Sequence, residues 1–397
     1  MTPGDVADRR LRGLYALIWT VFSAFLPFFV LWLRDRGLSP SRIGVVLATS
    51  ALASVVAAPM WSHAADRRVG TVRTLRVAFI AAAALAIVLA SIPASFATIA
   101  VVAAALAGAQ APQTPLTDAL TVTVLGPERL REYGSFRLWA SVGWGVGSIA
   151  FGALFERLGL DLLLPVYAVG LLASAAYIGR IGPSRPTPAD DRRSRLGSAG
   201  EALTQVPSFA VFLLGVFVFG ASTRASWDFV PLRIASGGGG PFLVGVAAGV
   251  SAFVEIPFMR SSGSLLDRFG ARAVFVTGGS VYVAAALAWA VVSAPLAVTA
   301  VRIAIGVGFG LTYVTLVVMT GTLVPERLRN TGQTLLQVAS WGLAPIAGSL
   351  AGGIVYQRLG PTQLFLGSAV GIAIGMTVVW NATRRLGTPQ RQPLWPP

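Results

Sequence analysis

Long apolar stretches, separated by short polar turns, make up most of this chain of 397 residues. Many of these stretches hold about 20 residues, the length that an α-helix needs to cross the hydrocarbon core of a bilayer. Strict alternation of apolar and polar residues, which the strands of a membrane β-barrel require, is missing. The pattern therefore predicts an all-α membrane protein with twelve transmembrane helices, at residues 11–34, 42–63, 74–92, 95–123, 134–156, 161–181, 207–235, 241–262, 272–293, 295–323, 330–357 and 361–384.

A polar segment in the middle of the chain separates six predicted helices from six others. Residues 182–206 are rich in proline, serine, glycine and charged residues, a composition that cannot bury a core. We therefore expect four parts: an N-terminal six-helix bundle at 1–181, a cytoplasmic linker at 182–206, a C-terminal six-helix bundle at 207–385 and a cytoplasmic tail at 386–397.

Two polar turns occur in both halves. The sequence Pro-Glu-Arg-Leu-Arg stands at residues 127–131 and again, 198 positions later, at 325–329. An Asp-Arg pair stands at residues 66–67 and, 201 positions later, at 267–268. Two repeats at nearly the same offset indicate an internal duplication, and duplicated halves around a site near the middle of the membrane are typical of secondary transporters. The alternative is that these are only arginine-rich turns.

Composition and charge agree with a membrane protein. Hydrophobic residues make up 55% of the chain and charged residues 12%, whereas a soluble domain carries about 25% charged residues. The net charge of +15 comes from arginine alone. Twenty-one arginines fall in loops on one predicted side and six on the other, which by the positive-inside rule places both termini in the cytoplasm. The charge thus indicates topology in the cell inner membrane, and we expect no nucleic-acid partner.

Several kinds of chemistry are excluded by residue types that the chain lacks. It has no cysteine, and its one histidine is His63, so thiolate metal sites, disulfides and histidine-rich metal sites are ruled out. It has no lysine, so a phosphate-binding loop of the type G-x-x-x-x-G-K-[ST] is ruled out as well. We therefore expect no metal and no cofactor, with a proton as the coupling ion, and no enzymatic activity.

Glu255 is the strongest candidate for carrying that proton. It lies roughly 14 residues into the eighth predicted helix, near the middle of the bilayer. An ionisable side chain at that depth is costly and indicates function, and a buried carboxyl can alternate between its charged and neutral forms. The alternative is a structural glutamate that Arg260 or a backbone group satisfies.

Asp118 and Arg137 are the next candidates. They lie on consecutive predicted helices joined by a short turn, so the helices should run antiparallel and the two side chains should pair. An anionic substrate could then compete for Arg137 and free Asp118, which would couple substrate binding to protonation. The alternative is a permanent pair that only holds the helices together.

A third charged group lies in the seventh predicted helix. Arg224 and Asp228 are four residues apart and so share one helical face. They either neutralise each other or, with Trp227 between them and Pro231 after them, form a bending outer gate. Arg302, near the start of the tenth helix, is expected to extend outward to the interface.

Aromatic residues offer stacking surfaces for a substrate with a flat ring. The rings that could line a cavity are Trp19, Phe22, Trp139, Trp144, Trp227, Tyr313 and Trp341. The alternative for each ring is packing or an interfacial belt.

The pattern G-x-x-x-D-R-x-G-x-R resembles the loop signature of the major facilitator superfamily. It is complete at Gly263, Asp267, Arg268, Gly270 and Arg272. In the first half only Asp66 and Arg67 keep the pattern, because Ser62 replaces the first glycine and Gly70 is displaced by one position. The resemblance implies a fold of two six-helix halves related by pseudo-two-fold symmetry, in which these loop residues hold a gate rather than a substrate.

Four further stretches are similar to a narrower branch, that of the phenylpropionate permeases and nucleoside–proton symporters, with lactose permease as a more distant relative. They are FLPFFVLWLRDRGLSPSRIGVVLA (25–48), PLTDAL (115–120), YGSFRLWASVG (133–143) and VSAFVEIPF (250–258). The branch implies a carboxylate in the eighth helix, where Glu255 stands. Its nucleoside symporters also carry an acid in the tenth helix, whereas residues 308–319 contain none, which argues against a nucleoside.

Together these features predict a proton-coupled symporter that imports a small organic solute by alternating access. Arginine near the site favours an organic anion such as an aromatic acid. We expect proton coupling at Glu255 and Asp118, and substrate binding at Arg137, Trp139, Trp19, Phe22, Arg224, Trp227, Asp228, Tyr313 and Trp341. We expect a monomer whose partners are the bilayer and the solute.

Three alternatives remain. One is a nucleoside or sugar symporter of the same fold. Another is an efflux antiporter, although the fifth helix lacks the G-P-x-x-G-G stretch typical of those proteins. The third is a membrane receptor that transports nothing, which would need no charged groups inside its helices.

Overall fold

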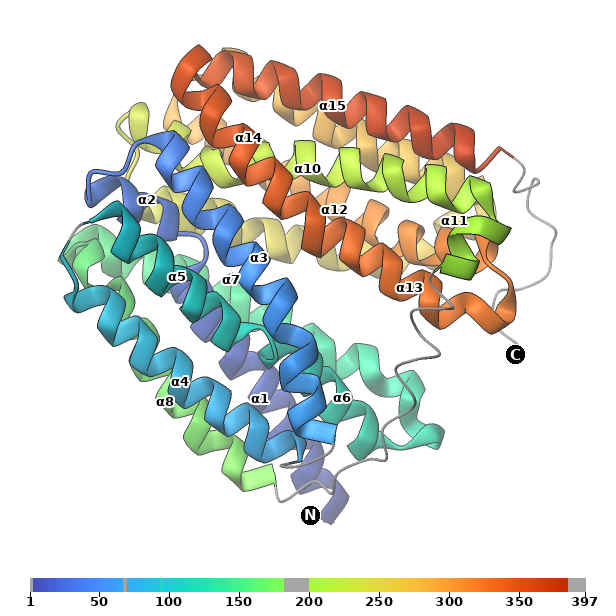
Figure 1. Cartoon of the computed structure of the whole chain (residues 1–397), viewed down its shortest axis with the longest axis horizontal. Helices are drawn as coiled ribbons and strands as arrows, with labels where there is room; N and C mark the ends of the chain where they lie inside the picture. The colour runs from blue at the N-terminus through green and yellow to red at the C-terminus, as the bar shows by residue number, and fades with distance from the viewer. Residues whose placement is uncertain (1–2, 67–69, 94, 182–199, 385–397) are drawn as a thin grey trace. The chain divides into compact units, whose positions relative to one another are not determined.

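The computed structural model describes residues 3–66, 70–93, 95–181 and 200–384, and within them every regular element is helical (Figure 1). The predicted all-α fold is confirmed. The first helices are α1 (Pro3–Phe25), α2 (Phe29–Asp35), α3 (Pro40–Ala64), α4 (Thr71–Ser91), α5 (Phe96–Gln110), α6 (Gln113–Leu125), α7 (Tyr133–Leu158) and α8 (Leu163–Ile178). They are followed by α10 (Pro207–Ser236), α11 (Pro241–Val291), α12 (Pro295–Leu323), α13 (Arg329–Gln337), α14 (Ala344–Leu359) and α15 (Pro361–Ala382).

Eleven segments of the described chain are long and apolar enough to cross a membrane. The longest of them, α11, has 51 residues and is interrupted at Gly270, whose φ of 78° lies in the left-handed region. Only glycine adopts that region without a steric penalty. Because the chain turns at Gly270, α11 contains both spans predicted at 241–262 and 272–293, and the twelve predicted spans are accounted for.

Three spans that the sequence analysis predicted as single helices are divided. The span at 11–34 is interrupted at residues 26–28 between α1 and α2, where Pro27 cannot donate a backbone hydrogen bond. The span at 95–123 is interrupted before α6, whose first residues follow Pro112. The span at 330–357 contains a π-helical turn, η6 (Val338–Leu343). It precedes Pro345, which removes the donor for the Trp341 carbonyl.

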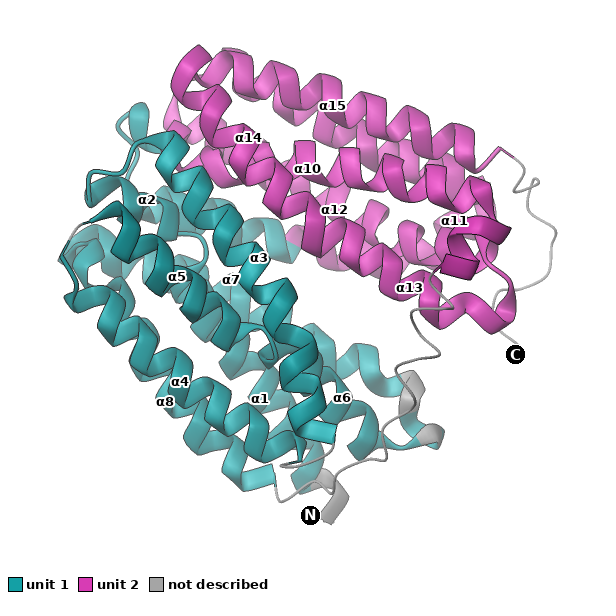
Figure 2. Ribbon diagram, in the orientation of Figure 1, with its two compact units in different colours: residues 1–190, 234–253 teal, residues 191–233, 254–397 magenta. Residues whose placement is uncertain are grey.

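The chain divides into two compact units, coloured separately in Figure 2. The first comprises residues 1–190 and 234–253, and the second comprises residues 191–233 and 254–397. Of the predicted linker, residues 182–199 lie outside the described residues, whereas 200–205 are helical. The predicted tail at 386–397 also lies outside them.

The same close contact between two helices occurs inside each unit. In the first unit α7 approaches α1 so closely that a Cβ on Gly143 would collide with the carbonyl oxygen of Ala16. In the second unit a Cβ on Gly348 of α14 would collide in the same way with the carbonyl oxygen of Ala221 of α10. Both residues of the second contact lie 205 positions after their counterparts. The duplication predicted from the polar turns is therefore also present in the helix packing.

Candidate functional site

In the first unit, Asp118 is held by a tyrosine rather than by the arginine that the sequence suggested. The Tyr15 hydroxyl of α1 donates a hydrogen bond of 2.7 Å to Asp118 Oδ1 of α6. Tyr15 is 1% exposed, and Asp118 is partly buried. The expected ion pair between Asp118 and Arg137 is not formed. Asp118 is bonded to Tyr15 and Arg137 lies against Trp19, both on α1.

Arg137 of α7 is placed against an aromatic cluster. Its guanidinium carbon lies 4.5 Å from the centre of the Trp19 ring, a cation–π contact. The Trp19 ring meets Phe22 edge-on at 5.7 Å and Trp144 at 6.0 Å. The structure therefore brings Arg137, Trp19 and Phe22 together, whereas Trp139 stands apart from this cluster and is 42% exposed.

The second unit contains a cavity among α10, α11, α12 and the segment from α13 to α14. It holds about 720 Å³ of empty space, including the part open to solvent. The predicted residues Arg224, Trp227, Tyr313 and Trp341 all line it. The other polar or aromatic residues of its wall are Phe219, Thr223, Tyr282, Phe309, Thr312, Gln337 and Ser340.

Six of the 17 residues that line this cavity are aromatic. Phe309 stacks on Tyr313 at 5.5 Å between ring centres and meets Trp341 edge-on at 6.3 Å. Trp227 lies 6.0 Å from Tyr282 and 6.3 Å from Phe309. Ring faces attract flat or apolar groups, so the cavity suits a small organic molecule with a ring.

Arg224 and Asp228 form the ion pair that their spacing predicted. The Arg224 Nε–Asp228 Oδ1 distance is 2.8 Å, and Asp228 is only 7% exposed. Ser349 of α14 donates a further hydrogen bond of 2.5 Å to Asp228 Oδ2. The carboxylate thus joins α10 to α14 and keeps the guanidinium at the edge of the cavity.

Arg302 does not extend outward as expected. Its guanidinium carbon lies 4.7 Å from the centre of the Trp227 ring, so it packs toward the cavity wall. It also interacts electrostatically with Glu255 and with Arg224. Glu255 is partly buried on α11 and interacts with Tyr282 as well. Arg302 therefore lies against the Trp227 ring within electrostatic range of Glu255 and Arg224, and Arg224 is paired with Asp228.

Sequence reasoning missed Arg302, Tyr282 and Phe309 as residues of this site. One signal was available: Arg302, Phe309 and Tyr313 follow one another at seven and four positions, which places them on one face of α12. Gln337 and Ser340 carried no such signal, because the π-helical turn changes which side chains face the cavity.

Comparison with known proteins identifies the chain. Residues 9–367 match the model of the MFS_1 like family. The chain belongs to that family. It is a transporter of the major facilitator superfamily and a multi-pass membrane protein, and its relatives are permeases rather than enzymes.

Three relatives each cover between 63% and 95% of the transporter. The maltose permease of Geobacillus stearothermophilus is 26% identical over 372 residues, which are 94% of this chain and 93% of that protein. An Escherichia coli (strain K12) protein named "Probable 3-phenylpropionic acid transporter" is 26% identical over 63% of this chain and 65% of its own length. The crystal structure of the nucleoside transporter NupG aligns with a TM-score of 0.81 at 15% identity, covering 95% of this chain and 99% of that one.

The loop signature of the superfamily is partly visible in this transporter. Gly270 takes the left-handed conformation described above, and Arg272 places its guanidinium carbon 3.8 Å from the centre of the Trp380 ring. Arg268 stacks on Phe269 at 5.1 Å. Asp267 is exposed and pairs with no arginine among the described residues. No Cβ contact explains Gly263.

In the first half of the transporter, Asp66 is an exposed residue at the end of the helical segment that contains α3. Arg67 lies outside the described residues. Within the part of the chain that the structure describes, no group of three histidine, aspartate or glutamate side chains could hold a metal ion.

Proposed function

We propose that this transporter is a proton-coupled symporter that imports a small organic anion by alternating access. The observation that carries the proposal is the cavity of the second unit, whose wall includes six aromatic rings and Arg224. Arg302 lies against the Trp227 ring of that wall and interacts electrostatically with Glu255. An ionisable group inside a membrane protein indicates an ion pathway or a proton relay. We also propose an inner-membrane location with both termini in the cytoplasm, based on the distribution of arginine.

The charges around the cavity suggest how a proton and an anion travel together. Arg224 and Arg302 balance Asp228 and Glu255 when all four groups are ionised. Protonation of Glu255 leaves one positive charge in excess near the Trp227 ring, against which the Arg302 guanidinium lies. A substrate carboxylate is then attracted to Arg302, and its departure favours release of the proton. The coupling is reciprocal, because whatever makes protonation favour the anion also makes the anion favour protonation.

The aromatic wall favours a substrate that carries a flat ring beside its carboxylate. The three relatives are named for a disaccharide, an aromatic acid and nucleosides. Two arginines at one site match the aromatic acid best, since maltose and nucleosides are neutral. We therefore propose an aromatic or other organic anion, with a nucleoside or sugar as the second candidate because of the relatives named for them.

In the first unit we propose that Asp118 takes part in proton coupling and that Arg137 and Trp19 contact the substrate. Tyr15 gives Asp118 a partner that stays neutral, so protonation of Asp118 does not leave an unpaired cation. Arg137 is attached to a ring face rather than to a carboxylate. Its guanidinium therefore keeps hydrogen-bond donors for an incoming anion.

Uptake into sealed vesicles tests the proposal. An imposed inward proton gradient should drive accumulation of 3-phenylpropionate, and uridine and maltose serve as the neutral competitors. Glu255→Gln should abolish accumulation while exchange of labelled for unlabelled substrate continues. If the Glu255→Gln variant still accumulates 3-phenylpropionate, Glu255 does not carry the coupled proton. Movement of the substrate outward against the proton gradient identifies an antiporter instead.

A further inference from the structure

The repeated turns at 127–131 and 325–329 lie between the helices that carry the site residues. The first turn lies within η2 (Pro127–Glu132) and joins α6, with Asp118, to α7, with Arg137. The second contains η5 (Glu326–Leu328) and joins α12, with Phe309 and Tyr313, to the segment that carries Trp341. Each turn therefore joins two elements that carry candidate site residues.

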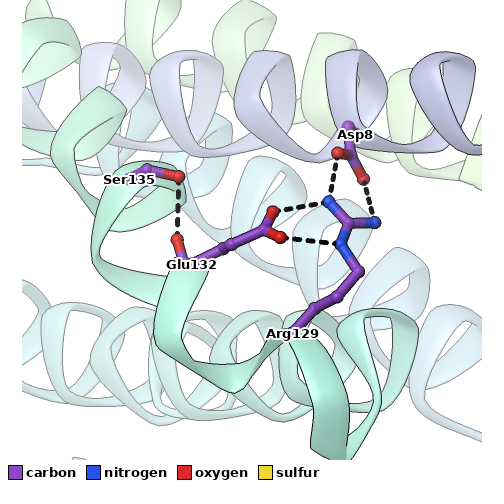
Figure 3. A network of polar contacts seen from close by, with 4 residues as sticks. All are labelled: Asp8, Arg129, Glu132 and Ser135. Atoms are coloured by element: carbon purple, nitrogen blue, oxygen red, sulfur yellow. Dashed lines mark hydrogen bonds and ion pairs between the residues drawn. The ribbon is translucent and has the colours of Figure 1, made fainter. Parts of the chain in front are cut away.

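In the first unit, the turn is attached to the start of α1 through Arg129. Its guanidinium donates to both carboxylate oxygens of Asp8, at 2.5 and 3.2 Å. The same guanidinium donates to both oxygens of Glu132, at 2.6 and 3.1 Å. Figure 3 shows the guanidinium between the two carboxylates, with Ser135 donating a hydrogen bond of 2.8 Å to the Glu132 carbonyl oxygen. These bonds hold the pKa of Glu132 below its usual value and raise the pKa of Arg129.

In the second unit, the corresponding arginine makes the corresponding attachment. Arg327 donates to Glu201 Oε1 and, at 2.6 Å, to Gln205 Oε1. Glu201 and Gln205 belong to the helical stretch at 200–205 that precedes α10, and Gln205 Nε2 donates to Glu201 Oε1 at 2.9 Å. Arg129 and Arg327 are the third residues of their turns, 198 positions apart. In the first unit that arginine is tied to the start of α1, and in the second unit it is tied to the helical stretch in front of α10.

The helix reached in this way is the third wall of each site. Asp8, Tyr15, Trp19 and Phe22 follow one another at seven, four and three positions, so they share one face of α1. Fixing Asp8 therefore fixes the helical face that presents Tyr15 to Asp118 and Trp19 to Arg137. In the second unit, the stretch at 200–205 ends one residue before α10, which carries Arg224, Trp227 and Asp228.

We propose that Arg129 and Arg327 are positioning residues, each holding three site-bearing helices of its own unit in register from their ends. Arginine suits this task, because its planar fork binds two acceptors at once in a fixed geometry, which lysine cannot do. Exposed ion pairs contribute little to stability, so their effect belongs to the geometry of the site. The proposal does not depend on the identity of the substrate.

The second unit offers the cleaner test, because the other acceptor of Arg327 is a neutral glutamine. The variants are Glu201→Arg, Arg327→Glu and the double exchange. Arg329→Glu is the matched control, because among the described residues the ion-pair partner of Arg329 is Glu326 of its own turn, at 3.5 Å. Arg327→Gln replaces Arg327→Glu if the latter does not accumulate in the membrane.

The rate at which an introduced cysteine pair forms a disulfide measures how α10 and α14 are aligned, and it needs no substrate. The chain has no native cysteine, and a Cβ on Gly220 would lie 3.0 Å from the Cβ of Ala344, slightly less than the roughly 3.5–4.5 Å of a disulfide. With Gly220→Cys and Ala344→Cys in the background, oxidation of the full-length protein in membranes should be fast. We expect each single charge variant to slow it about tenfold and the double exchange to restore it to within about twofold.

The same variants are then assayed for 3-phenylpropionate uptake. The KM should rise about tenfold in each single charge variant and recover in the double exchange. A purely structural role predicts a lower melting temperature with unchanged oxidation rate and KM. That result, or a double exchange that restores nothing, overturns the proposal. If 3-phenylpropionate is not taken up at all, the proposed function fails while the oxidation rates still decide this inference.

Discussion

At the scale of single residues, the hydrogen bond from Tyr15 is what makes Asp118 different from an ordinary buried acid. A hydrogen bond to a charged group contributes about 1.5–3 kcal/mol. Tyr15→Phe should therefore lower the stability by about 2 kcal/mol, the middle of that range, and reduce proton-driven uptake. Initial uptake rates and thermal unfolding in detergent measure the two effects.

The matched control for Tyr15→Phe is Tyr167→Phe. Tyr167 is equally buried in the same unit, but its hydroxyl accepts a hydrogen bond of 2.8 Å from Gln110 rather than serving an acid. Tyr167→Phe should also destabilise the protein but leave the uptake per folded molecule unchanged. Equal loss of uptake in both variants would show that Tyr15 matters only for packing.

Asp228 is the second residue whose partners allow a quantitative prediction. Removing one member of a buried ion pair costs about 3–5 kcal/mol, but Arg224 is 35% exposed, so water screens part of that penalty. We expect Asp228→Asn to cost about 2 kcal/mol and Ser349→Ala about 1 kcal/mol. Chemical denaturation gives both values.

Ser226→Ala serves as the control for these two variants. Ser226 is buried on the same helix as Asp228, but its hydroxyl only donates to the Ser222 carbonyl, at 3.4 Å. A change below about 0.5 kcal/mol is expected, as for most substitutions without a specific mechanism. If Ser349→Ala is equally mild, the 2.5 Å hydrogen bond contributes nothing net.

At the scale of elements, apolar length located the helices but could not locate the side-chain partners. A span must cross the bilayer, so its length follows from hydrophobicity alone, and the interruptions near Pro27 and Pro112 follow from proline. Asp118 was placed correctly on its helix, but its predicted partner, Arg137, was wrong. Its partner in the structure, Tyr15, lies 103 positions away in the sequence. Such a contact depends on how helices pack, which hydrophobic periodicity does not encode.

Arg302 shows the same limit. Its position near the start of a span suggested an interface, since a long side chain can reach water from there. The ring of Trp227 on another helix offers a cation–π partner instead. The π-helical turn before α14 was not predicted either, although it brings Ser340 and Trp341 to the cavity.

The turn inside α11 gives a prediction about an element. Gly270→Ala places a Cβ on a residue with φ of 78°, which costs about 1–2 kcal/mol. Gly263→Ala is the control in the same loop signature, because Gly263 is helical and nothing lies within 4 Å of its Cβ position. It should be neutral or slightly stabilising. Denaturation midpoints that fall equally for both variants would contradict the role of the left-handed turn.

At the scale of the whole molecule, the charges of Arg224, Asp228, Glu255 and Arg302 predict how transport responds to membrane voltage. If Glu255 alone binds a proton while one anion enters, the transported charge is zero, so a potential set with potassium and valinomycin should change the initial uptake rate of 3-phenylpropionate less than about twofold. Proton-gradient-driven uptake should remain. If Asp118 also carries a proton, each cycle moves one net positive charge, and about 100 mV inside negative would add roughly 2.3 kcal/mol to accumulation. Glu255→Gln should lose proton-driven accumulation and keep exchange in either scheme, so the voltage response of the unaltered transporter decides between them.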